Sequence, residues 1–122
     1  MARILIVDDS PTQLLSLKRI VEKLGHGVLT AADGAAGVEI AKREIPDLIL
    51  MDVVMPNLNG FQATRTIARD AKTSHIPVIL VTTKGQDTDK VWGMRQGAKA
   101  YVTKPIDEKA LAQTIRTILP AP

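Results

Sequence analysis

The sequence predicts an α/β fold in which helices cover both faces of a five-stranded parallel sheet. Five short apolar runs alternate without a break with segments of helical periodicity. The runs are apolar throughout, which is typical of parallel strands buried on both sides. Strict strand–helix alternation produces parallel strands joined by helical crossovers. The 122 residues suffice for one domain with one core.

The first half of the chain is predicted to contain three strands and two helices. The strands are expected at residues 4–7, 27–31 and 48–51. The first helix begins after Ser10, a capping residue followed by Pro11, and stops at Gly25. The second helix follows Asp33 and ends before Pro46.

The second half is predicted to add two strands and three helices. The strands are expected at residues 77–81 and 100–102. Two helices are expected at residues 60–71 and 88–96, and a loop at residues 53–59 precedes the first of them. The last helix follows the N-cap Asp107, with Ile106 and Leu111 as a hydrophobic staple. Residues 120–122 are expected to extend beyond it as a frayed end.

Acidic, hydroxyl and amino side chains follow the predicted strands. Asp8 and Asp9 follow the first strand, and Asp52 follows the third. Thr82 follows the fourth strand, and Lys104 follows the fifth. In doubly wound sheets, ligands bind beyond the carboxyl ends of the strands, where the strand order reverses. If the first and third strands are neighbours, three carboxylates meet in one crevice.

Three carboxylates in one crevice favour a magnesium site. Like charges that close repel one another, so each carboxyl group resists ionisation. Mg²⁺ relieves this repulsion because it takes oxygen ligands in an octahedron and keeps several waters. Thr82 and Lys104 beside the ion suit phosphoryl chemistry, in which one of the carboxylates is the nucleophile.

A set of separated motifs supports a family resemblance. The set is Asp8-Asp9, Asp52 with Met55-Pro56 and Gly60 after it, Thr82, and Lys104-Pro105. It resembles the receiver domain of bacterial response regulators, the CheY-like family, over the whole chain. The resemblance implies a flavodoxin-like (βα)5 fold with strand order 2-1-3-4-5. It also implies a single stand-alone receiver domain, 1–122, and a cis Lys104-Pro105 bond.

The resemblance also implies how the site binds Mg²⁺. Asp9 would be a direct ligand, and Asp8 would act mainly through water. Asp52 and the backbone carbonyl of Val54 would complete the protein's share of ligands.

The resemblance assigns the phosphoryl chemistry to three residues and a switch to two. Asp52 would be the phosphoacceptor, with a histidine kinase as the phosphodonor. Thr82 would contact the phosphoryl group, and Lys104 would pair with it. Thr82 and Tyr101 would form the switch. The domain would catalyse only its own phosphorylation and dephosphorylation, so it is not expected to turn over a substrate.

Three positions depart from the family pattern. Asn59 stands where an acidic residue often precedes Gly60. Val54 and Lys84 occupy two positions that flank the phosphoryl group in the family and tune its hydrolysis. Neither residue offers a carboxylate or amide to orient an attacking water. We therefore expect slow self-hydrolysis.

Within this family, the chain most resembles the regulators of type IV pilus, twitching-motility chemosensory systems. A downstream protein partner is expected on the fourth helix, fifth strand and fifth helix. Residues 84–122 hold seven Lys and Arg against four Asp and Glu, which accounts for the whole net charge of +3. The alternative is a phosphate sink or phosphotransfer intermediate for the same kinase.

Two other classes use related folds or chemistry. A phosphatase of the haloacid dehalogenase class needs a second Asp two residues after the nucleophile, where this chain has Val54. A flavin-binding flavodoxin-like module needs a longer phosphate loop after the first strand. Both classes are therefore disfavoured.

The composition indicates where the protein acts and which classes of partner it binds. The charge is only mildly basic and the chain has three aromatic residues, so a nucleic-acid partner is not expected. There is no cysteine and no apolar run near the roughly 20 residues of a membrane span. We expect a cytoplasmic protein without membrane insertion, as a monomer or weak dimer.

Overall fold

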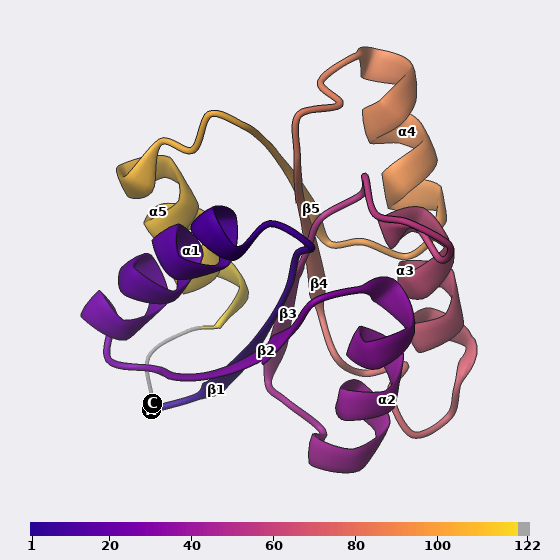
Figure 1. Cartoon of the computed structure of the whole chain (residues 1–122), viewed down its shortest axis with the longest axis horizontal. Helices are drawn as coiled ribbons and strands as arrows, with labels where there is room; N and C mark the ends of the chain where they lie inside the picture. The colour runs from indigo at the N-terminus through magenta and orange to yellow at the C-terminus, as the bar shows by residue number, and fades with distance from the viewer. Residues whose placement is uncertain (120–122) are drawn as a thin grey trace.

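The five strands form one parallel sheet in the order β2-β1-β3-β4-β5 (Figure 1). The computed structural model describes residues 1–119. The elements are β1 (Arg3–Val7), α1 (Pro11–Lys23), β2 (Gly27–Ala31), α2 (Gly34–Glu44), β3 (Leu48–Met51), α3 (Gly60–Arg69), β4 (Val78–Thr82), α4 (Asp87–Arg95), β5 (Ala100–Thr103) and α5 (Glu108–Ile118). The predicted fold class and strand order are confirmed. The expectation for residues 120–122 lies outside the described residues.

Two layers of helices cover the sheet. Figure 1 shows α1 and α5 on one face and α2, α3 and α4 on the other. Alternate residues of β1 point to opposite faces: Ile4 and Ile6 pack in the core beneath α1 and α5, whereas Leu5 and Val7 pack beneath α2 and α3. Apolar side chains on both faces explain why the strand runs show no alternation with polar residues.

The strand register brings the carboxyl ends of β1 and β3 to the same level. Val7 pairs with Met51 in the parallel ladder between these strands. The next residues, Asp8 and Asp52, therefore leave the sheet side by side. Thr82, at the end of β4, is likewise level with Thr103 at the end of β5.

Side-chain caps set where most helices begin. The Ser10 side chain accepts a hydrogen bond from the backbone N–H of the third residue of α1, and the Asp33 side chain accepts one from the third residue of α2. The predicted Asp107 cap of α5 is also present. Asn59 and Gln62 form a reciprocal capping box at the start of α3, which the sequence analysis did not predict. Within residues 1–119, no helix has both the length and the apolar character that crossing a bilayer requires.

One predicted helix is shorter in the structure. We expected a helix at residues 60–71, but α3 ends at Arg69. Asp70 has an extended backbone, and its side chain accepts a hydrogen bond from the Lys72 backbone N–H. This local bond competes with helix continuation, as Asp side chains often do.

Candidate functional site

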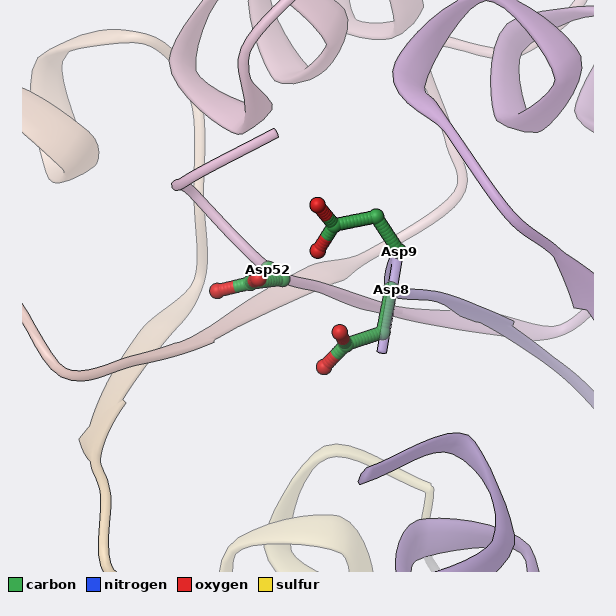
Figure 2. A group of neighbouring side chains, drawn as sticks. All are labelled: Asp8, Asp9 and Asp52. Atoms are coloured by element: carbon green, nitrogen blue, oxygen red, sulfur yellow. The ribbon is translucent and has the colours of Figure 1, made fainter. Parts of the chain in front are cut away.

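Three carboxylates meet at the carboxyl ends of β1 and β3. Oxygen atoms of Asp8, Asp9 and Asp52 lie within 4.8 Å of one another. Figure 2 shows Asp8 and Asp9 extending from the end of β1 toward Asp52 at the end of β3. The structure thus brings together the acidic residues that the sequence predicted would meet.

The three carboxylates differ in exposure to solvent. Asp8 is 1% exposed and Asp52 is 7% exposed, whereas Asp9 is exposed. Two of the carboxylates are therefore shielded from water, and the third is open to solvent. Buried charges need partners, because an unpaired charge away from water is costly.

Lys104 supplies one positive charge to this cluster. Its Nζ lies 2.9 Å from Oδ2 of Asp8 and 3.8 Å from Oδ1 of Asp52. The backbone N–H of Ser10 donates to the other oxygen of Asp8. The expected cis Lys104-Pro105 bond is present. One ammonium group against three carboxylates leaves the cluster with a net negative charge.

The pKa of Asp52 is raised above its ordinary value. Burial is the main cause, because it disfavours the charged form. The ammonium of Lys104 opposes the shift, and the charge of Asp8 adds to it. The N–H groups of Val53 and Val54 also hold the pKa down, and the first donates to Oδ1 of Asp52 at 2.9 Å.

This donor set fits Mg²⁺. All three side chains offer oxygen ligands, their oxygens lie close enough to share one ion, and the cluster has excess negative charge. A divalent cation would offset the repulsion by Asp8, which adds to the effect of burial on the pKa of Asp52. The Val54 carbonyl as a further ligand stays a prediction; the residue itself is 53% exposed.

Thr82 and Tyr101 are both hydrogen-bonded to the backbone of Lys84. The Lys84 N–H donates to Oγ1 of Thr82 at 3.3 Å. The Tyr101 hydroxyl donates to the Lys84 carbonyl at 2.5 Å. Burial, with the charges of Asp89 and Asp52, raises the pKa of Tyr101 to about 12, so the hydroxyl keeps its proton.

The link through Lys84 was not predicted from the sequence, because it uses the backbone of this residue and not its side chain. Backbone hydrogen bonds in an irregular loop leave no residue-type signature. The bond from Ser10 to Asp8 was also missed, although an Asp that caps the N–H two residues ahead is a familiar turn signal.

Gly60 lets α3 begin directly against the site. A Cβ at this position would lie 2.0 Å from the Asp52 carbonyl oxygen and 2.7 Å from the Val53 Cα. No side chain fits in that space. The Gly60 N–H also donates to the Val53 carbonyl. This hydrogen bond joins the two ends of the loop between β3 and α3.

Comparison with protein families and curated sequences gives a consistent result. The family model described as "Response regulator receiver domain" matches residues 4–116. Protein PilH of Pseudomonas aeruginosa is 62% identical over 119 residues, covering 98% of each chain. The response regulator PleD of Caulobacter vibrioides is 38% identical over 117 residues, which are 96% of this chain but 26% of PleD.

Solved structures share the fold over nearly the whole chain. The Vibrio cholerae chemotaxis protein CheY4 superposes with a TM-score of 0.90 at 29% identity, covering 97% of this chain and 98% of that one. A CheX-CheY-BeF3-Mg complex from Borrelia burgdorferi gives a TM-score of 0.91 at 26% identity, covering 98% and 90%.

Proposed function

The chain belongs to the response regulator receiver domain family of two-component systems, and from this premise we propose that Asp52 accepts the phosphoryl group. The observation that best supports this is the convergence of three carboxylates and one ammonium at the carboxyl edge of the sheet. Asp52 belongs to this cluster and lies 3.8 Å from the Lys104 Nζ. Its assignment over Asp8, which is nearer to Lys104, follows the motif of the family. The proposed donor is a phosphohistidine of a histidine kinase.

The proposed Mg²⁺ ligands are Asp8, Asp9, Asp52 and the Val54 carbonyl, with Asp8 acting mainly through water. When bound, the ion neutralises charge on the carboxylates and on the incoming phosphoryl oxygens. Lys104 would add a second positive charge, since its Nζ contacts Asp8 and lies 3.8 Å from Asp52.

In the proposed transfer, a carboxylate oxygen of Asp52 attacks phosphorus. A P–O bond forms as the N–P bond of the phosphohistidine breaks. The histidine ring leaves with the electron pair of that bond and takes up a proton. The surrounding residues position and neutralise the group and form no covalent bond, as is usual for phosphoryl transfer.

Thr82 is well suited to bind the transferred group. Its hydroxyl is buried and accepts a hydrogen bond from the Lys84 N–H. Among residues 1–119 no hydrogen bond is donated by this hydroxyl, which leaves its proton available to a phosphoryl oxygen. A shift of Thr82 would disturb Lys84, whose carbonyl accepts the Tyr101 hydroxyl. This path supports the proposed switch between Thr82 and Tyr101.

The proposed output is a change in protein–protein binding on α4, β5 and α5. The pathway we propose is chemosensory control of type IV pilus twitching motility, supported by the 62% identity to PilH. Action in the cytoplasm, where the kinase would donate, belongs to the same proposal.

Incubation with acetyl phosphate and Mg²⁺, followed by intact mass measurement, tests the assignment. The wild type should gain one phosphoryl group, and Asp52→Asn should gain none. Glu39→Gln, a matched loss of one charge on exposed α2 surface, should behave as wild type. Asp9→Asn should require more Mg²⁺. Full phosphorylation of the Asp52→Asn protein would refute the proposal.

A further inference from the structure

The ends of α3 and α4 enclose a hollow on the protein surface. Its volume is about 390 Å³, within the range of small-ligand sites. The residues that line it are Arg65, Ala68, Arg69, Arg95, Gln96 and Gly97. Three of these six residues are arginines, and all three are exposed.

These arginines have no acidic partner within the described part of the chain. None of Arg65, Arg69 and Arg95 forms an ion pair within 4.0 Å among residues 1–119, so no carboxylate of the described residues neutralises the three guanidinium groups directly. Asp70, the acid next to Arg69 in sequence, pairs with Lys42 at 3.5 Å. Arg65 and Arg69 are four residues apart on α3, a spacing at which like charges repel. No ion pair within the described residues offsets the repulsion between Arg65 and Arg69.

Helix dipoles explain only part of this arrangement. Cations are favourable in the last turn of a helix, so Arg69 in α3 and Arg95 in α4 stabilise their own helices. Arg65 lies one turn earlier and gains little. The two helix ends contribute roughly half a negative charge each, which three guanidinium groups outweigh. The hollow is therefore positive overall.

Two of the lining residues, Ala68 and Gly97, are small and lie close together. Gly97 has a φ of +110°, and a Cβ there would lie 2.8 Å from the Cβ of Ala68. The two helix ends thus meet without a large side chain between them. The lining contains no aromatic residue on which a base could stack. Recognition here would depend on charge and on the planar donor geometry of arginine, which matches phosphate oxygens.

From this geometry we propose that the hollow binds a compact anion with two or more phosphoryl groups. The site differs from the proposed phosphorylation site. Helix α3 begins at Gly60 against Asp52 and ends at Arg69, and ten helical residues span about 15 Å. The proposal is independent of the function proposed for Asp52.

Calorimetric titration with inorganic pyrophosphate tests this site. The buffer should contain a chelator and little salt, because without a divalent cation the carboxylates at the other site repel anions, and salt screens exposed charges. Wild type should bind one pyrophosphate, more tightly than inorganic phosphate. Arg65→Gln with Arg69→Gln should weaken binding about tenfold or more, since each lost charged hydrogen bond contributes substantially.

Lys18→Gln with Arg19→Gln is the matched control, because it also removes two exposed positive charges from one helix. It should change pyrophosphate affinity less than twofold. Equal weakening by both double variants would overturn the proposal, since net charge alone would then explain binding. Absence of pyrophosphate binding to the wild type would overturn it too. So would binding of polyglutamate, but not pyrophosphate, with the same dependence on Arg65 and Arg69, which would indicate an acidic protein partner.

Discussion

Without Mg²⁺, replacing Asp52 by Asn should stabilise the folded protein. At an effective dielectric constant of about 20, Lys104 at 3.8 Å attracts Asp52 by about 4 kcal/mol. Asp8, within 4.8 Å, repels it by about 3 kcal/mol or more. These two terms nearly cancel. The cost of burying the Asp52 charge therefore remains.

The neutral amide of the Asp52→Asn variant would avoid that cost. It would also keep a side-chain oxygen for the Val53 N–H, which donates to Asp52 in the wild type. We expect a gain of about 1–2 kcal/mol in the free energy of unfolding, measured by urea denaturation at neutral pH with a chelator present. The corresponding rise in Tm is several degrees. Mg²⁺ should stabilise the wild type more than the variant, because ligands that bind only the folded state raise its stability.

The gain should depend on pH in a defined direction. Folding raises the pKa of Asp52, so the folded state binds this proton more tightly than the unfolded state. This contribution to stability is therefore full below the unfolded-state pKa and is lost as the pH rises through the higher, folded-state pKa. The advantage of Asp52→Asn should therefore grow as the pH rises through the raised pKa of Asp52 and should disappear in acid, where the wild-type carboxyl is also uncharged.

Asp8→Asn provides the contrast. Asp8 is nearer to Lys104, at 2.9 Å, and also accepts the Ser10 N–H. Its loss should lower stability by about 1–3 kcal/mol. If Asp52→Asn proves less stable than wild type at neutral pH without Mg²⁺, the charge balance argued here is wrong.

Three further predictions concern other parts of the site. Val54→Asn combined with Lys84→Glu should shorten the lifetime of the phosphorylated protein, because both new side chains can orient a water. The lifetime is measured from the rate of phosphate release, and an unchanged rate would show that these two positions do not control hydrolysis. Gly60→Ala should lower the free energy of unfolding by about 3 kcal/mol or more, because the added Cβ would lie 2.0 Å from a backbone oxygen; a urea midpoint equal to wild type would contradict the packing. Lys90→Glu with Arg95→Glu should weaken binding of the phosphorylated protein to its downstream partner and leave phosphorylation by acetyl phosphate intact; unchanged binding at low and moderate salt would locate the output surface elsewhere.

The fold was predictable because its signals are local and repeated. Every strand is a short apolar run, and the side chains of Ser10, Asp33 and Asp107 cap the helices as their types suggest. The end of α3 was predicted two residues too late, at residue 71 instead of Arg69. The extended backbone of Asp70, whose side chain accepts the Lys72 N–H, ends the helix there.

The site was predictable to the extent that parallel strands align their ends. With β1 and β3 as neighbours and Val7 paired with Met51, Asp8 and Asp52 lie side by side. The position of Lys104 between these two carboxylates could not be worked out in the same way. Whether the Lys104 ammonium reaches the carboxylates depends on the path of the β5–α5 loop and on side-chain torsions. Hydrophobic periodicity in the sequence carries no information on either.

The link through Lys84 illustrates the limit most clearly. Thr82 and Tyr101 were singled out from the sequence by resemblance, yet the structure joins them through a backbone amide and a backbone carbonyl. Backbone groups are the same in every residue, so only the fold decides which of them meet a given side chain. It follows that the Lys84 side chain can be exchanged without breaking either hydrogen bond. A change in the loop conformation would break both bonds together. Coupling between Thr82 and Tyr101 should therefore depend on the conformation of the loop after β4 more than on which side chain it presents.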